Sequence, residues 1–459
     1  MELQQFTEEQ KRHLQKIALE NIIAHWASNE DLAKEPKIFI GGEGCYVYDI
    51  HGKKYLDSFS SLITSIFGHG RIEMKQAIAE QMDKIAFFPN YHDSFTVPQI
   101  ELAEKLAEIA PGELSVSFFV NSGSEANETA LKMARQYHWL NGQPHRYKVI
   151  ARRYSYHGTT LGVTSYTGFP ALRQCVEPLL PGALFTHPVS CHNCELGLDL
   201  SSCNMRCLEL LEKMIQWENP ETISSMIMDP IPGSNFGYPI PPDGYLQGVR
   251  EICNKYGILL IFDEVQTGFG KTGKWFACEN WNVTPDMMSI SKALTAGYLP
   301  LSVVMTSKKI ADAFKKGAGS EFRSGGTYGG HPLSCVVALA TIEIMQKERV
   351  LENVVETGAY LKSKLEKLYK YHIVGDIRGM GMIWAIELVA DRDSGSKFDS
   401  NLNVGTFIRD WCWDNGMILR NNGNTLVIAP ALVMTKEQVD IMIGKIDKAI
   451  AEAIKYFKI

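Results

Sequence analysis

Residues 116–128 read Val-Ser-Phe-Phe-Val-Asn-Ser-Gly-Ser-Glu-Ala-Asn-Glu, and this stretch indicates the class of fold. The first five residues form an apolar run with the length of a buried strand. The next residues predict a helix, because apolar side chains recur on one face at Ala126, Ala130, Met133, Ala134 and Tyr137. A strand that ends in Ser-Gly-Ser at a helix start offers free N–H groups and hydroxyls to an anion. Ser124 is also an ordinary N-cap residue, so the stretch alone leaves both interpretations open.

The same alternation of strand and helix continues along the chain. After about residue 70, further apolar runs alternate with helical stretches, at 147–150, 225–228, 258–262 and 301–305. This alternation predicts an α/β fold whose large domain has a mostly parallel central sheet with helices on both faces.

The two ends of the chain have a different pattern. We expect a helix over residues 10–26 and a hairpin between the runs 45–48 and 54–56. After about residue 350, we expect a helix, hairpin-like strands at 382–388 and 426–429, and a closing helix. Together these segments predict a smaller α+β domain built from both termini, with boundaries at 1–70, 71–335 and 336–459.

The composition removes several classes of function. Of the 459 residues, 45% are hydrophobic and the net charge is -6 without a basic stripe, so we expect neither disorder nor a nucleic-acid partner. No apolar window is long enough for a membrane span, and the first residues lack the layout of a signal peptide. Single cysteines in apolar surroundings indicate a reducing, cytoplasmic location; they are Cys253, Cys278, Cys335 and Cys412.

Two further residues favour an anion-binding site with chemistry beside it. Asp263 follows the apolar run 258–262, so it lies where open α/β sheets bind ligands, although it could be an N-cap or a metal ligand. Lys292 emerges from apolar residues, which disfavours its charge as imine chemistry requires. The glycine-rich stretch 268–274 has the spacing of a nucleotide-binding loop, but Trp275 replaces the hydroxyl that would hold magnesium.

In this combination and order, the motifs resemble those of class-III (ω-amino acid) aminotransferases, which are pyridoxal-phosphate enzymes of fold type I. The resemblance covers residues 46–434 and also extends to taurine–pyruvate aminotransferases. It rests on Ser-Gly-Ser-Glu-Ala-Asn-Glu at 122–128, Tyr-His-Gly at 156–158, Asp-Glu-Val-Gln-Thr-Gly-Phe-Gly at 263–270, Pro-Asp at 285–286, Lys292, and Thr-Tyr-Gly-Gly-His-Pro at 327–332. It implies pyridoxal 5'-phosphate as cofactor, an amine donor and a keto-acid acceptor as substrates, and a homodimer or tetramer.

The resemblance assigns a role to each matching residue. Lys292 would hold the cofactor covalently and move the substrate proton, while Asp263 would keep the pyridine nitrogen protonated. One residue, Thr327, would come from the neighbouring subunit to the phosphate. The implied cofactor-binding set is Ser122, Gly123, Ser124, Tyr156, His157, Gly158, Asp263, Val265, Gln266, Lys292 and Thr327.

The substrate prediction rests on three positions: two at which expected charged residues are missing, and one at which an arginine is present. Members that use 2-oxoglutarate carry an arginine where this chain has Val427, and a glutamate where it has Ser234. Arg420 lies where pyruvate-using members carry an arginine in a mobile loop, although it could merely cap a surface turn. We therefore expect an ω-transaminase that forms L-alanine from pyruvate, the alternatives being a 2-oxoglutarate-using member, an aminomutase or an epimerase. The apolar pocket candidates, which leave the donor open, are Leu62, Ile63, Phe87, Phe88 and Tyr91.

Three features depart from the family pattern. Asp229 replaces a glutamate, and Lys271 replaces an arginine in what we expect to be a surface exchange. Four cysteines lie in one segment, at Cys191, Cys194, Cys203 and Cys207. Their spacing would suit structural zinc, but we expect reduced thiols and no metal, with zinc and a disulfide left open as alternatives.

Overall fold

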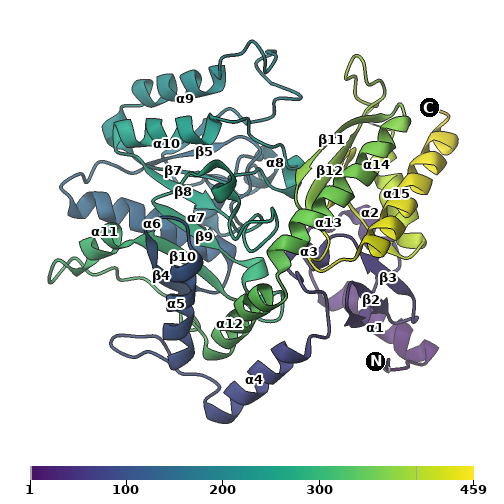
Figure 1. The fold of residues 1–459 in the computed structure, drawn as a ribbon, viewed down its shortest axis with the longest axis horizontal. Helices are drawn as coiled ribbons and strands as arrows, with labels where there is room; N and C mark the ends of the chain where they lie inside the picture. Colours follow the sequence, from purple (N-terminus) through teal and green to yellow (C-terminus); the bar gives the residue numbers. More distant parts are fainter. Residues whose placement is uncertain (1–2, 400) are drawn as a thin grey trace.

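The computed structural model describes residues 3–399 and 401–459 (Figure 1). Its centre is a seven-stranded sheet in the order β4-β10-β9-β8-β7-β5-β6. Within this sheet β10 pairs antiparallel with both neighbours, and the strands from β9 to β6 pair in parallel, which confirms the predicted mostly parallel sheet. The strands are β4 (Leu114–Val120), β5 (Lys148–Arg152), β6 (Ala183–Thr186), β7 (Ile223–Met228), β8 (Leu259–Asp263), β9 (Met287–Ile290) and β10 (Ser302–Ser307).

Helices cover both faces of this sheet, because its central strands are apolar on both sides. On one face, Leu259 and Ile261 belong to a buried cluster with the apolar side of α6. On the other face, Leu260 and Phe262 belong to the main core. The longer helices of this part are α4 (Ile72–Lys84), α5 (Val97–Ile109), α6 (Gly123–Leu140), α9 (Arg206–Trp217), α10 (Tyr245–Tyr256) and α12 (Pro332–Lys347).

The two ends of the chain meet in two smaller sheets beside the large one (Figure 1). Met417 pairs with Leu56, so a C-terminal strand extends the N-terminal hairpin. The first sheet contains β1 (Phe39–Glu43), β2 (Tyr46–Asp49), β3 (Lys54–Asp57) and β13 (Met417–Ile418). The second contains β11 (Val374–Met380), β12 (Ile383–Leu388), β14 (Arg420–Asn422) and β15 (Thr425–Ile428). Their helices are α13 (Val350–Leu365), α14 (Val404–Asp414) and α15 (Lys436–Phe457).

Several local predictions need correction. Helix α1 (Glu8–Asn21) ends five residues before Trp26, because Ile22 adopts an extended conformation and α1 buries no side chain that would favour a longer helix. The strands β6 and β9 were not predicted, since a polar residue interrupts or ends each short apolar run, Thr186 in β6 and Ser289 in β9. The hairpin-like strands at 382–388 and 426–429 pair with each other, whereas β11 is the hairpin partner of β12.

Short helices complete the described structure. They are α2 (Asn29–Leu32), α3 (Ser60–Ile63), α7 (Leu161–Thr164), α8 (Pro170–Arg173) and α11 (Lys308–Ala311). None of the helices in the described ranges is both long and apolar enough to cross a membrane. The four cysteines predicted to be core thiols, at positions 253, 278, 335 and 412, are buried and free.

Candidate active site

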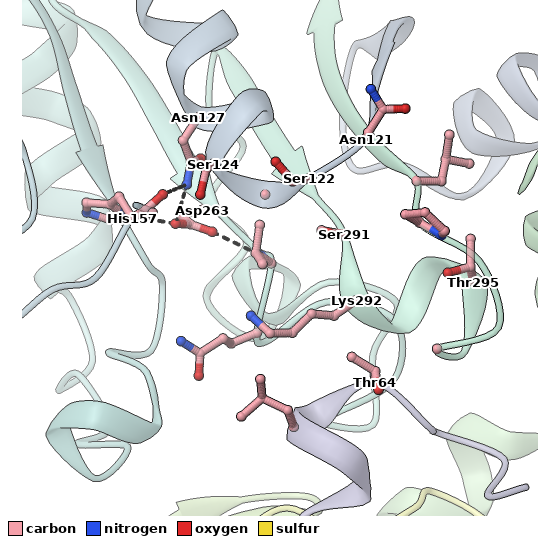
Figure 2. Close-up of a pocket in the computed structure, with 18 of the residues that line it drawn as sticks. Thr64, Asn121, Ser122, Ser124, Asn127, His157, Asp263, Ser291, Lys292 and Thr295 are labelled. Carbon is pink, nitrogen blue, oxygen red and sulfur yellow. Dashed lines mark hydrogen bonds and ion pairs between the residues drawn. The ribbon is translucent and has the colours of Figure 1, made fainter. Parts of the chain in front are cut away.

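A cavity of about 430 Å³ lies at the carboxyl ends of four strands of the large sheet (Figure 2). The residues that follow β4, β7 and β9, and the last residue of β8, all line it: Asn121, Asp229, Ser291 and Asp263. The structure also brings most of the predicted site together here. The predicted residues that line this cavity are Leu62, Ser122, Gly123, Ser124, Tyr156, His157, Gly158, Asp263, Val265, Gln266 and Lys292.

The start of α6 forms one wall of the cavity. Ser122, not Ser124, is the N-cap, since its Oγ accepts from the Glu125 N–H at 3.2 Å. The suggestion that Ser124 is an ordinary cap is therefore wrong, and its hydroxyl instead accepts from the Thr159 N–H at 3.0 Å. A Cβ on Gly123 would lie 3.0 Å from a Val265 methyl, so the glycine keeps this wall open. The first N–H groups of a helix lack partners within it, which makes this wall suitable for a phosphate.

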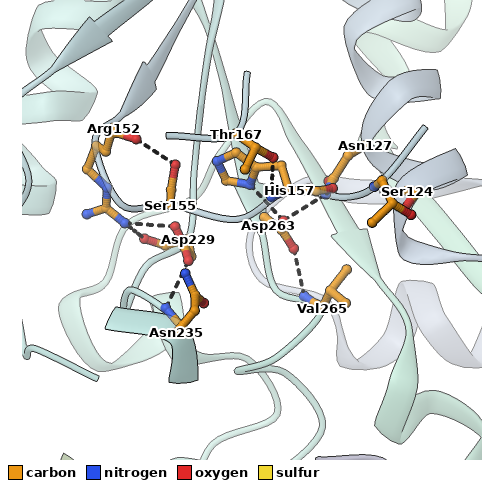
Figure 3. A network of polar contacts seen from close by, with 12 residues as sticks. Ser124, Asn127, Arg152, Ser155, His157, Thr167, Asp229, Asn235, Asp263 and Val265 are labelled. Atoms are coloured by element: carbon orange, nitrogen blue, oxygen red, sulfur yellow. Dashed lines mark hydrogen bonds and ion pairs between the residues drawn. The ribbon is translucent and has the colours of Figure 1, made fainter. Parts of the chain in front are cut away.

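Asp263 is a buried carboxylate held by three donors (Figure 3). Its Oδ2 accepts from Asn127 Nδ2 at 2.7 Å and from His157 Nδ1 at 2.8 Å. Its Oδ1 accepts from the Val265 N–H at 3.1 Å. Because an ionised carboxylate can only accept, the His157 tautomer here carries its proton on Nδ1. Sequence reasoning missed Asn127, although it lies within the Ser-Gly-Ser-Glu-Ala-Asn-Glu motif.

The neighbouring carboxylate, Glu264, points away from the cavity because successive residues of a strand face opposite sides. Its Oε1 accepts from the Cys278 N–H at 2.8 Å. Complete burial raises the pKa of Glu264 to about 7, although bonds from Thr267 and Cys278 oppose this shift. Of the two adjacent acids, only Asp263 therefore offers a carboxylate to the cavity.

Lys292 follows β9 with a φ of 46°, a left-handed conformation that is strained for a residue with a side chain. Burial lowers the pKa of its amine to about 8, with Asp263 opposing the shift and Arg420 reinforcing it. An amine with such a pKa is partly neutral near pH 7, so it is available as a nucleophile and base. The nitrogen extends into the cavity (Figure 2).

The predicted surface location of Lys271 is wrong. Its side chain is completely buried, and its Nζ has no hydrogen-bond partner among the described residues. Burial lowers the pKa of Lys271 to about 7; the charge of Lys292 lowers it further and Asp57 opposes the shift. The turn that carries it lies against the terminal sheets, where the Met382 N–H donates to the Lys271 carbonyl at 2.9 Å. A polar residue in a glycine-rich turn gives no sequence signal of such a tertiary contact.

Asp229, the shorter replacement for glutamate, takes part in a buried ion pair (Figure 3). Arg152 Nη2 lies 3.1 Å from its Oδ1, and both side chains are buried. The other oxygen accepts from the Gly233 N–H at 3.0 Å. The same turn fixes Gln266, whose Oε1 accepts from the Ser234 N–H at 3.1 Å. Asp229 therefore fixes the turn that positions Gln266 at the cavity.

A second cavity, of about 1000 Å³, shares Lys292, Tyr156, Gln266 and Leu62 with the first and is also lined by Arg420. Arg420 belongs to strand β14 and not to a loop, and it lines the cavity instead of capping a surface turn, so these two expectations are corrected. Its guanidinium lies 5.3 Å from the Phe59 ring centre and forms no ion pair with a described carboxylate. Burial lowers its pKa, although the Tyr238 and Tyr156 phenols oppose the shift.

The remaining predicted residues lie elsewhere. Ile63 and Ser234 line the second cavity, and Val427 is buried opposite Arg420 in the strand pair β14–β15. Phe87, Phe88, Tyr91 and Thr327 line neither cavity of this chain.

The sequence pattern of the aminotransferase class-III family matches residues 32–450. The chain is a class-III aminotransferase. It is 36% identical over 443 residues to the putrescine–pyruvate aminotransferase of Pseudomonas aeruginosa, covering 96% of each chain. It is 36% identical over 423 residues to the adenosylmethionine-8-amino-7-oxononanoate aminotransferase of Geobacter sulfurreducens, covering 91% of this chain and 92% of that one.

Solved structures agree with this family. An (S)-enantioselective ω-transaminase from Thermomicrobium roseum is 37% identical, with a TM-score of 0.93 over 96% of this chain and 99% of that one. The ω-transaminase of Pseudomonas jessenii in complex with PMP is 32% identical, with a TM-score of 0.93 over 96% and 98% of the two chains. This class-III aminotransferase has fold type I, and its family depends on pyridoxal phosphate (PLP).

The cavity of this aminotransferase fits PLP. The free N–H groups at the start of α6 suit a phosphate dianion, and no Cβ obstructs their approach at Gly123. Asp263 suits a protonated ring nitrogen, and Lys292 has the lowered pKa that covalent attachment requires.

We expect Lys271 to make the stability of this aminotransferase depend on pH. Its folded pKa, about 7, lies below the unfolded value of about 10.4, so the unfolded chain binds the extra proton between these values. The buried charge therefore lowers the free energy of unfolding by its full amount below pH 7. This loss of stability becomes smaller as the pH rises, by about 2 kcal/mol between pH 7 and pH 9. Lys271→Met should melt several degrees above the wild type at pH 7, and thermal unfolding should show this gap narrowing towards pH 9. A gap that stays constant with pH would contradict the titration of Lys271.

We expect Asn127 to position Asp263. Asn127→Leu removes one donor from a buried carboxylate, so turnover should fall about tenfold, in keeping with about 1–3 kcal/mol for a lost buried bond. The pH at which the absorption of the bound cofactor changes should also shift, since Asp263 controls the ring nitrogen. Asn141→Leu, at the exposed end of the same helix, is the control and should change neither quantity. An unchanged spectral titration in Asn127→Leu would restrict Asn127 to a structural role.

Proposed function

We propose that the chain is an ω-transaminase that moves an amino group from a terminal amine or ω-amino acid to pyruvate, releasing L-alanine. The observation that carries this proposal is Arg420, a half-buried guanidinium that lines the same cavity as Lys292 and forms no ion pair with a described carboxylate. A buried cation without a partner is costly, and the carboxylate of a keto acid would relieve that cost. The P. aeruginosa relative, whose name includes pyruvate, supports this acceptor.

Two further positions favour pyruvate over 2-oxoglutarate. At Val427, where 2-oxoglutarate-using members carry an arginine, the chain has a buried apolar side chain. Ser234 lies where those members carry a glutamate, and a serine has no carboxylate with which Arg420 could form an ion pair. One arginine suffices for the single carboxylate of pyruvate, whereas the second carboxylate of 2-oxoglutarate would lack a cation.

Five side chains of the two cavities have a role in this mechanism. Bound PLP supplies the electron sink for the carbanion at the substrate carbon that carries the amino group. Lys292 Nζ accepts the proton from that carbon of the donor. In the second half of the reaction it returns a proton to the keto-acid carbon that receives the amino group. Asp263 keeps the ring nitrogen protonated, while Asn127 and His157 fix the orientation of the carboxylate. Arg420 orients the keto acid through its carboxylate.

Further side chains would hold the cofactor in place. Tyr156 and Val265 would contact the two faces of its ring, and Gln266 would reach its phenolic oxygen. Ser122, Gly123 and Ser124, with the neighbouring segment His157–Gly158, would form the phosphate cup. Leu62 and Ile63 bound the substrate side with apolar atoms, which tolerates a carbon chain on the donor without selecting one.

The active site is proposed to be shared between two copies of the chain. Thr327 is exposed and lines neither cavity of its own chain, so it is free to reach the phosphate of a neighbour. Phe88 and Tyr91 are 47% and 52% exposed, and the adjacent Phe87 ring lies 5.3 Å from that of Tyr328. These residues therefore belong to one apolar surface of the kind that subunit interfaces cover. A homodimer is the smallest assembly that fulfils these roles.

We further propose the domain boundaries and location that the sequence suggested. The terminal sheets would form the smaller domain and residues 71–335 the PLP-binding domain, but the predicted boundary at 335/336 falls inside α12 (Pro332–Lys347). Because α12 packs on α4 and α5, we move the boundary to the end of this helix, so that residues 1–70 and 348–459 form the smaller domain. Buried free thiols suit a reducing cytoplasm, which we propose as the location.

Replacing Arg420 tests the acceptor. Arg420→Ala should raise the KM for pyruvate at least about tenfold, which corresponds to one charge-assisted hydrogen bond. Arg420→Lys keeps the charge but not the planar guanidinium, so its KM for pyruvate should lie between those of the wild type and of Arg420→Ala. Steady-state kinetics with pyruvate and 2-oxoglutarate should also give a higher kcat/KM for pyruvate in the wild type. Preference for 2-oxoglutarate, or unchanged pyruvate kinetics in Arg420→Ala, would overturn the proposed acceptor.

Replacing Thr327 tests the shared site. Thr327→Ala should weaken PLP binding about tenfold through loss of a hydroxyl bonded to the phosphate, and Thr327→Ser should retain most of the affinity. Analytical ultracentrifugation, followed at a wavelength that the bound PLP absorbs, should show that PLP sediments together with the dimer. A monomer that keeps its full complement of PLP would contradict a site shared between subunits.

A further inference from the structure

The segment from residue 187 to 205, between β6 and α9, has no helix or strand of its own (Figure 1). It contains three of the four clustered cysteines, and the fourth, Cys207, lies in the first turn of α9. Its internal backbone bonds are few, such as Gly197 N–H to the Cys194 carbonyl at 2.9 Å. Long irregular segments in compact proteins are usually functional or need an additional constraint.

The cysteines are arranged in two close pairs. Two residues separate Cys191 from Cys194, three separate Cys203 from Cys207, and eight residues connect the pairs. Close pairs joined by a loop are the spacing by which structural zinc sites gather four ligands. All four thiols are free and half-buried, whereas the unclustered Cys175 is exposed.

The fold brings both pairs to one small cavity of about 40 Å³. This volume exceeds that of a single water site, about 10–15 Å³, and suits one bound ion. Arg206 also lines the cavity, but its guanidinium is paired with Glu209. Three further polar residues line the cavity, namely His187, Ser190 and Glu195, and His187 lies 4.0 Å from Glu195. The rest of the wall is apolar, consisting of Pro188, Val189, Leu196, Leu198, Leu200, Met205 and Pro242. The four thiols are therefore the sulfur ligands that a mostly apolar wall offers to a metal ion.

Another group of potential ligands lies nearby but is already neutralised. His192, Asp376 and Glu387 are the only three such described residues whose ligand atoms all lie within 4.8 Å of one another. Arg378 Nη1, however, lies 2.7 Å from Asp376 and 2.5 Å from Glu387, so a cation would have to displace it. No three of the four cysteine Sγ atoms lie within 4.8 Å of one another, so binding one ion would require the loop to draw them together. The segment has no helix or strand of its own that would oppose such a change.

We propose that Cys191, Cys194, Cys203 and Cys207 bind one structural Zn²⁺ that fixes the segment 187–205. Four thiols would release four protons and give a tetrathiolate site, with no change in oxidation state. The segment reaches the terminal sheets, since His192 Nδ1 lies 3.8 Å from Asp376 of β11. The ion would therefore fix a contact between the PLP-binding part of the chain and the terminal sheets.

Metal analysis of the reduced holoenzyme, incubated with equimolar Zn²⁺ and then desalted, tests this proposal. We expect about one Zn²⁺ per chain, with X-ray absorption showing four sulfur neighbours at about 2.3 Å. The double variant Cys203→Ser/Cys207→Ser should lose the metal, while Cys175→Ser is the matched control and should keep it. A strong chelator should lower the melting temperature of the wild type and of the control by several degrees.

Two results would overturn the proposal, and both use the wild type, so they stand even where the double variant fails to fold. The first is less than about 0.2 Zn²⁺ per chain after the incubation, against the full site expected for four thiolates. The second is a shortfall of titratable thiols in the denatured, unreduced protein, which would show that the pairs form disulfides.

Discussion

A buried carboxylate, Asp263, is the constraint on which the active site depends. A charge removed from water is tolerated only where donors replace the water, and three elements supply them here. Asn127 comes from α6, His157 from the loop after β5, and the Val265 N–H from the turn after β8. Because these donors must meet one carboxylate, α6 and the two loops are held at fixed positions relative to β8. The start of α6, the segment that carries Tyr156 and His157, and the carboxylate therefore keep one relative geometry.

Three positive charges in this part of the fold have fewer partners than Asp263 has. Lys271 is buried and Lys292 half-buried, and desolvation lowers the pKa of each amine, to about 7 and about 8. Arg420 adds a third cation on the substrate side. Such a site is destabilising in the empty protein, and a cofactor phosphate and a substrate carboxylate would offset this cost.

The terminal sheets complete the cavity from the side opposite the large sheet. Leu62 comes from the short helix after β3, and Arg420 from β14, so both ends of the chain contribute to the substrate side. The strand pair Met417–Leu56 joins these ends. The wall of the second cavity therefore depends on a part of the fold that is separate in sequence from the motifs that line the first cavity.

The sequence by itself determined the α/β class, the strand-ending positions of Asn121 and Asp263, and the family, because apolar periodicity and the order of short motifs are local properties. It could not determine burial at polar positions. Lys271 was expected at the surface, and its complete burial follows from a contact with residues more than a hundred positions away. The role of Asn127 as a donor to Asp263 also depended on a distance between elements. The choice of Ser122 over Ser124 as the N-cap, in contrast, was local and depended only on the residue at which α6 begins. Tertiary structure decided the first two points, since the environment of a polar group is set by the segments packed against it and not by its neighbours in sequence.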